Sequence, residues 1–94
     1  MKTSASDQVA DWLRSLPPEP KRRVRAALNG LEHWQGDIKA LRGELDGFYR
    51  LRVGGYRIVY RLTTGEVIRL DYADTRDVVY EAFRRLRLLG EMNE

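Results

Sequence analysis

The sequence predicts an α+β fold in which an N-terminal helical hairpin packs on a three-stranded antiparallel meander that is followed by a C-terminal helix. Two observations identify the elements. Apolar residues recur at helical spacing in residues 9–34 and 79–89, and they alternate with polar residues in 49–72. The third observation is size, because 94 residues with 43% hydrophobic content are enough for one compact core. We therefore expect a single domain spanning residues 1–94.

Two amphipathic helices come first. Ser4 or Ser6 can cap the first helix, and Pro17-Pro18 ends it, because proline cannot continue helical hydrogen bonding. Pro20 suits the first turn of the second helix, which Gly36 is expected to close. We expect residues 37–46 to form a connector. The two apolar faces consist of Val9, Trp12, Leu13 and Leu16, and of Val24, Ala27, Leu28, Leu31 and Trp34.

A β-hairpin spans residues 47–62. Gly54-Gly55 suits a two-residue turn, since glycine reaches positive φ without steric cost, and this turn places Arg52 opposite Arg57. Because strand side chains alternate between faces, one face of the hairpin is apolar and the other is cationic. The apolar face holds Tyr49, Leu51, Val53, Tyr56, Ile58, Tyr60 and Leu62. The cationic face, here called the arginine face, holds Arg50, Arg52, Arg57 and Arg61.

A third strand and a last helix complete the expected fold. A three-residue turn at 63–65 pairs Tyr60 with Ile68 and Arg57 with Asp71. Residues 1–6 are too short and polar to predict a strand, so the three-stranded sheet should have an exposed edge that can take a strand of a partner protein or a second copy of this chain. Asp74 or Thr75 can cap the last helix, whose apolar face consists of Val79, Phe83, Leu86 and Leu89 and which Gly90 is expected to end.

Composition excludes several kinds of site. There is no cysteine and only one histidine, His33, and all three serines lie within the first fifteen residues. A thiolate metal site or a Ser-His-Asp arrangement is therefore not expected, and we predict neither a metal nor a cofactor. The absence of cysteine, of a signal peptide and of a spanning apolar run predicts a protein of the reducing cytoplasm without a membrane partner.

The cations are mostly arginine. Fourteen of the seventeen basic residues are arginines, which suit planar, bidentate recognition of phosphate or carboxylate. Codon bias in a G/C-rich genome explains the overall preference equally well, but it does not explain why residues 47–62 contain no acid. The alternative to an anion-binding surface is a solvated sheet face on which Asp71 pairs with Arg57.

The arginine face predicts RNA binding. Neighbouring strands lie about 5 Å apart, which suits successive phosphates of an RNA strand. Phe48, on the same face, or Tyr80 can stack on a base, and stacking is worth ~1–3 kcal/mol per base. The RNA contacts expected on this basis, besides the hairpin arginines Arg50, Arg52 and Arg57, are Phe48, Arg61 and Arg69.

Three segments resemble toxins of the RelE/ParE superfamily of bacterial type II toxin-antitoxin modules. They are GFYRLRVGGYRIVYRL at 47–62, Leu41-Arg42-Gly43, and TRDVVY at 75–80. The resemblance implies the fold described above and a cognate antitoxin, with a homodimer or a heterotetramer with that antitoxin as possible assemblies. RelE-like members are mRNA interferases, metal-independent endoribonucleases that cleave mRNA on the ribosome and inhibit translation, whereas ParE-like members inhibit DNA gyrase.

The resemblance to the RelE-like branch also implies functional residues. Arg50 and Arg52 stand where that branch has two cations, and Arg57 and Tyr80 match later positions, with Arg76 one turn before Tyr80. In the implied chemistry the RNA 2′-hydroxyl attacks the adjacent phosphate and gives a 2′,3′-cyclic phosphate, so the protein orients RNA and stabilises charge. Tyr80 then acts as a base if neighbouring cations favour its phenolate, or it stacks, or it belongs to the core.

Two departures from the family pattern keep alternatives open. Asp74 occupies a place where RelE-like toxins can carry a basic catalytic residue, and the usual first β-strand is not evident in the sequence. The alternatives are a ParE-like gyrase inhibitor, or a catalytically inactive toxin homologue that acts as a binding module. In each case an acidic antitoxin segment that covers the arginine face should bind less tightly as salt increases.

Overall fold

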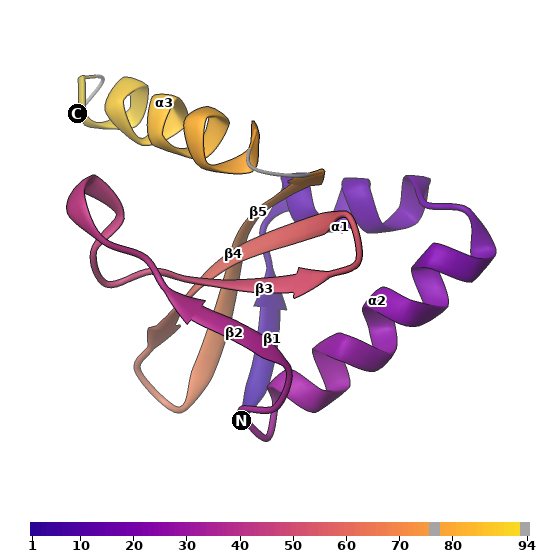
Figure 1. Ribbon diagram of the computed structural model, residues 1–94. Helices are drawn as coiled ribbons and strands as arrows, with labels where there is room; N and C mark the ends of the chain where they lie inside the picture. Colours follow the sequence, from indigo (N-terminus) through magenta and orange to yellow (C-terminus); the bar gives the residue numbers. More distant parts are fainter. Residues whose placement is uncertain (76–77, 93–94) are drawn as a thin grey trace.

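The computed structural model describes residues 1–75 and 78–92, and it has an α+β fold (Figure 1). A five-stranded mixed sheet has α1 and α2 on one face and α3 on the other. The strand order is β1-β5-β4-β3-β2. The elements are β1 (Lys2–Ala5), α1 (Asp7–Ser15), α2 (Pro18–Leu31), β2 (Asp37–Ala40), the 3₁₀ turn η1 (Gly43–Leu45), β3 (Tyr49–Val53), β4 (Tyr56–Thr63), β5 (Val67–Thr75) and α3 (Val78–Met92).

The helical hairpin forms as predicted, with one change at its end. Ser6 is the N-cap of α1, because its Oγ accepts a hydrogen bond from the Val9 N–H at 3.2 Å. The same hydroxyl donates to the Asp71 carbonyl oxygen at 2.9 Å, so the cap also fastens α1 to β5. Helix α2 ends at Leu31 rather than near Gly36, because Trp34 takes a left-handed φ of 56° and turns the chain into β2.

The register of the β3–β4 hairpin agrees with the prediction at every pair. Arg52 lies opposite Arg57, and Tyr49 lies opposite Tyr60. Gly54 has a φ of 58°, whereas Gly55 does not have a positive φ, so one position rather than both needs the conformational freedom of glycine.

The predicted register between β4 and β5 is wrong. The turn occupies residues 64–66 because Glu66 adopts a positive φ of 59° after Gly65, which places Tyr60 opposite Leu70. A bulge beside Tyr60 then leaves Asp71 as an extra residue, and Arg57 faces Asp74 instead of Asp71.

The sheet has two strands more than predicted. β1 pairs in parallel with β5, and β2 pairs antiparallel with β3, so both edges of the expected meander are covered. β2 alternates Ile38 and Ala40 with charged residues over only four positions. β1 shows no apolar alternation and is joined to β5 by backbone hydrogen bonds such as that from the Lys2 N–H to the Glu66 carbonyl at 3.3 Å. Such bonds carry no side-chain signal.

Two hydrophobic cores lie on opposite faces of the sheet. The core under α1 and α2 consists of Val9, Val24, Leu31, Leu51, Ile58, Tyr60, Ile68, Leu70 and Ala73. The core under α3 consists of Leu45, Phe48, Val59, Val79 and Phe83. Helix α3 therefore covers part of the face that was expected to be open.

This second core corrects two predictions. Phe48 is 7% exposed and packs edge-on against Phe83, with ring centroids 5.1 Å apart, so it is not available to stack on a base. Helix α3 continues past Gly90, and Leu86 and Leu89 are 51% and 52% exposed instead of buried. Asp74 and Thr75 belong to β5 and precede the described start of α3.

In the described part of the chain, no helix has the length and apolar character to cross a membrane.

Candidate functional site

A cavity of about 320 Å³ opens where β2, β3, β4 and α3 meet, and we call it the arginine cavity. Four of its lining residues were predicted as functional from the sequence, and the structure brings them together from β3, β4 and α3. The lining residues are Lys39, Leu41, Arg50, Arg52, Arg57 and Tyr80. The cavity thus carries four cationic side chains and one aromatic hydroxyl.

An acid of β2 orients the two arginines of β3. Nη1 of Arg50 donates to both the carbonyl oxygen and Oδ1 of Asp37 at 2.9 Å, and the Arg50 side chain is 14% exposed. Nε of Arg52 lies 3.4 Å from Oδ2 of the same residue. The hydrogen bond from Arg50 lowers the pKa of Asp37, so its carboxylate stays ionised at neutral pH. The hairpin itself has no acid, but β2 supplies one across the edge of the sheet.

Among the described residues, the other two cations, Arg57 and Lys39, form no ion pair with an acid. Nη1 of Arg57 donates to the carbonyl oxygens of Gly54 and Tyr56, both at 3.1 Å. Within residues 1–75 and 78–92, no carboxylate lies within ion-pair distance of Arg57 or Lys39. Their charges are therefore available to an anion that enters the cavity.

Lys39 was missed by sequence reasoning. It lies opposite Arg50 in the β2–β3 ladder, and that register brings its ammonium to the cavity. The sequence predicts a connector at 37–46, although a lone lysine beside the arginine-rich hairpin was a usable signal.

Tyr80 is half-buried at the edge of the second core and lines the cavity from the first turns of α3. Its ring packs against the cluster that contains Val59 and Phe83, which fixes the direction of the side chain. The position therefore contributes to core packing, one of the roles that the sequence left open, and it also lines the cavity.

Arg61 and Arg69 do not line the cavity. Arg61 lies opposite Arg69 farther along β4, with its Nε 3.4 Å from Oδ2 of Asp71, and Arg69 donates to the Ser4 hydroxyl at 2.9 Å. Arg76 lies outside the described residues.

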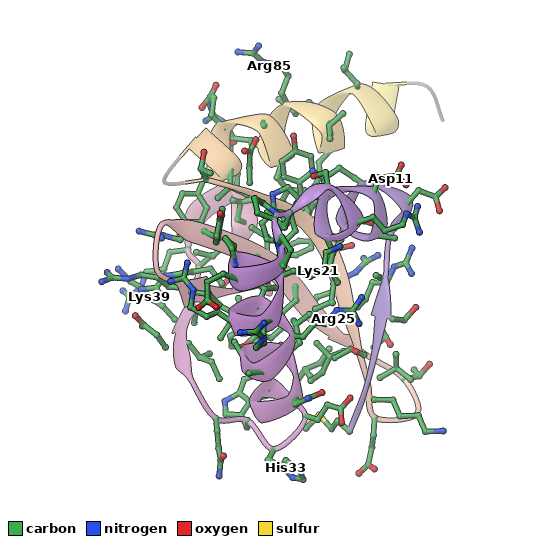
Figure 2. The ribbon with its side chains drawn as sticks, turned by 90° about the vertical axis from the view of Figure 1, so that its right-hand side faces the viewer. Asp11, Lys21, Arg25, His33, Lys39 and Arg85 are labelled. Atoms are coloured by element: carbon green, nitrogen blue, oxygen red, sulfur yellow. The ribbon has the colours of Figure 1, made fainter. Side chains whose placement is uncertain are left out.

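Asp74 and His33 both lie outside the arginine cavity. Oδ1 of Asp74 accepts the N–H of Thr75 at 2.7 Å. His33 lies at the end of the molecule opposite α3, which carries Arg85 (Figure 2). No group of three potential metal-ligating side chains occurs among the residues that the structure describes.

The bulge residue Asp71 makes folding stability pH-dependent. Its side chain is 12% exposed, and burial raises its pKa above the ordinary value of 3.8, although Arg61, Arg69 and Arg87 act in the opposite direction. As pH falls through the raised pKa, the folded protein takes up a proton before the unfolded chain does. The contribution of Asp71 to stability therefore increases as pH falls.

The variant Asp71→Asn isolates this effect, because all other titrating groups are shared with the wild type. We expect the wild type to gain stability relative to Asp71→Asn between about pH 7 and about pH 4. Urea unfolding of both proteins at the two pH values measures the difference. A stability difference that does not change with pH contradicts the assignment.

No protein-family model and no curated protein matches the sequence. Solved structures do match. RelE of the archaeal RelE-RelB complex from Pyrococcus horikoshii is 26% identical, with a TM-score of 0.65 over 81% of this chain and 94% of that chain. The toxin-antitoxin complex RelBE2 from Mycobacterium tuberculosis matches at 26% identity, with a TM-score of 0.66 over 80% and 96%.

A further match extends the likeness in fold. The isolated E. coli RelE toxin is 18% identical, with a TM-score of 0.67 over 90% of this chain and 97% of that chain. The present chain thus spans nearly the full length of these toxins and shares their arrangement of helices and sheet. These similarities support a RelE/ParE-type toxin fold for this chain, and among its branches the RelE-like one is favoured.

Proposed function

We propose that this toxin is a metal-independent mRNA endonuclease that acts on the ribosome and binds its substrate in the arginine cavity. The observation that carries the proposal is the convergence of Arg50, Arg52, Arg57, Lys39 and Tyr80 on one cavity. A cavity with four cations and one nearby acid favours a polyanion, and an aromatic wall favours a base beside it.

The proposed reaction needs no protein nucleophile. The 2′-oxygen of the RNA attacks the adjacent phosphorus, the bond from phosphorus to the 5′-oxygen breaks, and the products are a 2′,3′-cyclic phosphate and a 5′-hydroxyl. Arg52 and Arg57 stabilise the charge that develops on the phosphate oxygens. Arg50, fixed by Asp37, orients the strand.

Two protons move in this reaction. Tyr80 is the proposed general base that takes the proton from the 2′-hydroxyl, and the Lys39 ammonium gives one to the leaving 5′-oxygen. Among the cavity cations only lysine can supply a proton, because an arginine guanidinium does not deprotonate in proteins. Proton transfer from tyrosine back to lysine restores both groups for the next cycle.

A cognate antitoxin is the proposed protein partner. The similar structures include toxins solved with RelB or YefM. We propose that an acidic segment of the antitoxin occupies the arginine cavity and competes with RNA, in the bacterial cytoplasm where both would be made. Its affinity should fall with added salt.

Asp37 should limit the affinity of the cavity for RNA. In Asp37→Asn the amide oxygen still accepts from Arg50, but one negative charge beside the bound phosphate is lost. A unit charge about 4 Å away is worth ~1 kcal/mol in water, so we expect RNA to bind about fivefold more tightly. Fluorescence anisotropy with a labelled single-stranded RNA measures the dissociation constant.

The matched control for this substitution is Glu66→Gln. It makes the same change in net charge at an exposed site in the β4–β5 turn, away from the cavity. Binding by this variant should stay within about twofold of the wild type, because charges beyond a Debye length are largely screened. Weaker binding by Asp37→Asn than by the wild type contradicts the prediction.

Induction of this chain alone in bacteria tests the proposed function. Growth arrest accompanied by new mRNA 5′ ends inside translated reading frames, mapped by primer extension, is the expected result. Arrest with intact mRNA and a DNA-damage response would assign the ParE-like activity instead. No arrest would leave an inactive homologue that only binds.

A further inference from the structure

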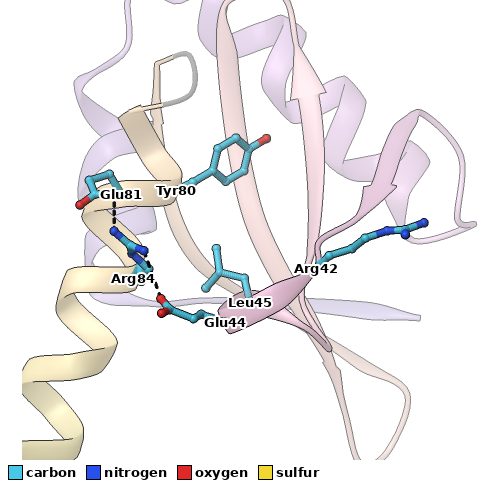
Figure 3. Close-up of a pocket in the computed structure, with 6 residues that line it drawn as sticks. All are labelled: Arg42, Glu44, Leu45, Tyr80, Glu81 and Arg84. Carbon is cyan, nitrogen blue, oxygen red and sulfur yellow. Dashed lines mark hydrogen bonds and ion pairs between the residues drawn. The ribbon is translucent and has the colours of Figure 1, made fainter.

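A second cavity shares Tyr80 with the arginine cavity. It has a volume of about 240 Å³ and lies between the η1 segment and α3 (Figure 3). We call it the carboxylate cavity, because two glutamates lie on its rim. Its lining residues are Arg42, Glu44, Leu45, Tyr80, Glu81 and Arg84.

The carboxylate cavity combines an apolar surface with fixed polar groups. The buried Leu45 and the ring of Tyr80 form the apolar part. Arg84 lies between the two glutamates, with Nη2 2.8 Å from Oε2 of Glu81 and Nη1 3.3 Å from Oε2 of Glu44 (Figure 3). These two bonds engage one oxygen of each carboxylate, and Oε1 of Glu81 lies 3.7 Å from Nη2 of Arg85. Each carboxylate oxygen can accept more than one hydrogen bond, so acceptor positions remain for a ligand, above all on Oε1 of Glu44.

Helix α3 is fixed to η1 by these bonds. Nη1 of Arg87 also donates to the Glu44 carbonyl oxygen at 3.1 Å, one helical turn beyond Arg84. The rim is thus joined to both elements, and the positions of the two carboxylates are set before any ligand binds.

We propose that the carboxylate cavity binds the nucleobase next to the phosphate held in the arginine cavity, and that it prefers a base with an exocyclic amino group to uracil. This inference rests on the proposed RNA-binding function. Because the two cavities share Tyr80, a base can lie against Tyr80 and Leu45 while its phosphate contacts the neighbouring arginines.

The preference follows from the rim chemistry. Ionised carboxylates only accept hydrogen bonds, and the amino group of cytosine is a donor that Asp or Glu side chains recognise. Uracil presents a carbonyl oxygen at the same position, where Glu44 or Glu81 would repel it. Cytosine and uracil therefore form a matched pair of ligands that differ at this edge.

Binding of short single-stranded oligomers of cytidine and of uridine, equal in length, tests the inference by fluorescence anisotropy. We expect the wild type to bind the cytidine oligomer about fivefold more tightly than the uridine oligomer. This factor is at the low end of the discrimination that one specific base contact gives, because both carboxylates are more than half exposed. In the double variant Glu44→Gln/Glu81→Gln the ratio of the two dissociation constants should fall to about one.

The matched control is Asp11→Asn/Glu66→Gln, which removes two negative charges at exposed sites outside both cavities. It should keep the wild-type ratio, although overall affinity increases in both double variants. A general electrostatic effect changes both dissociation constants by the same factor, so it cancels in their ratio. Urea unfolding of each variant shows whether α3 remains packed.

The outcomes separate this inference from the proposed function. Arg57→Ala should weaken binding of both oligomers and leave their ratio unchanged. A wild-type ratio near one, or a ratio that persists in Glu44→Gln/Glu81→Gln, overturns the inference while RNA binding stands. If the wild type binds neither oligomer, both proposals fail.

Discussion

Replacing Arg57 by alanine should lower the rate of mRNA cleavage by about 10²-fold or more, as expected when one preorganised group that stabilises transition-state charge is removed. Arg57 lines the arginine cavity and has no carboxylate partner among the described residues. Within the described part of the chain, its guanidinium donates hydrogen bonds to two backbone carbonyls at the hairpin turn, so folding should be retained. Growth after induction and mRNA end mapping report the loss of activity, and urea unfolding reports the fold.

Arg25→Ala is the control for this loss of a cation. Arg25 is exposed on α2, outside the arginine cavity (Figure 2). The control variant should remain toxic. Retained toxicity of Arg57→Ala would contradict the proposed role of the arginine cavity in mRNA cleavage.

Tyr80→Phe separates the two roles of that side chain. The ring and its packing are kept, and only the hydroxyl is lost. Cleavage should fall by about 10²-fold if the hydroxyl oxygen takes part in proton transfer. Unchanged cleavage would leave Tyr80 as a stacking and packing residue.

Replacing Phe83 by alanine should destabilise the fold by about 3 kcal/mol or more, because a buried Phe→Ala change loses apolar burial and leaves a cavity. Phe83 packs against Phe48 at 5.1 Å and against Tyr72 at 6.2 Å between ring centroids. Because Tyr80 lies one turn earlier on α3, RNA cleavage should fall as well. Urea unfolding measures the stability loss.

Leu86→Ala is the matched control on the same helix. Its side chain is largely exposed, so the free energy of unfolding should change by less than ~0.5 kcal/mol. Equal losses in the two variants would mean that α3 is not held by the aromatic cluster of the second core.

The β3–β4 hairpin could be predicted because two independent signals agree. The glycine turn and the alternation of side chains specify the same register, and the pair Arg52 and Arg57 follows from either signal. The β4–β5 register failed because Glu66, not glycine, takes the last left-handed position of the turn. The bulge at Asp71 has no sequence signal of its own.

β1 and β2 were missed for a different physical reason. Lys2–Ala5 and Asp37–Ala40 pair at the two edges of the sheet, and each spans only four residues, too few for a side-chain pattern to identify a strand. The same omission hid Lys39 and Asp37, which come from β2 and change the charge balance of the arginine cavity.

The placement of functional side chains was predictable for the residues that the hairpin register fixes. Arg50, Arg52 and Arg57 fall around one cavity for that reason. The prediction for Phe48 was wrong because alternation shows on which face of the sheet a side chain lies, but not whether another element covers that face. Here α3 covers that position and converts a presumed stacking residue into core.

The most direct test of the central claim uses the purified chain, ribosomes programmed with a defined message, and analysis of the 3′ end of the upstream fragment. We expect the wild-type chain to cleave the message without a metal cofactor of its own and to leave a 2′,3′-cyclic phosphate end. With Arg57→Ala, the cleavage and this product should both be lost. A message that remains intact with the wild-type chain, or equal cleavage by Arg57→Ala, would contradict the central claim.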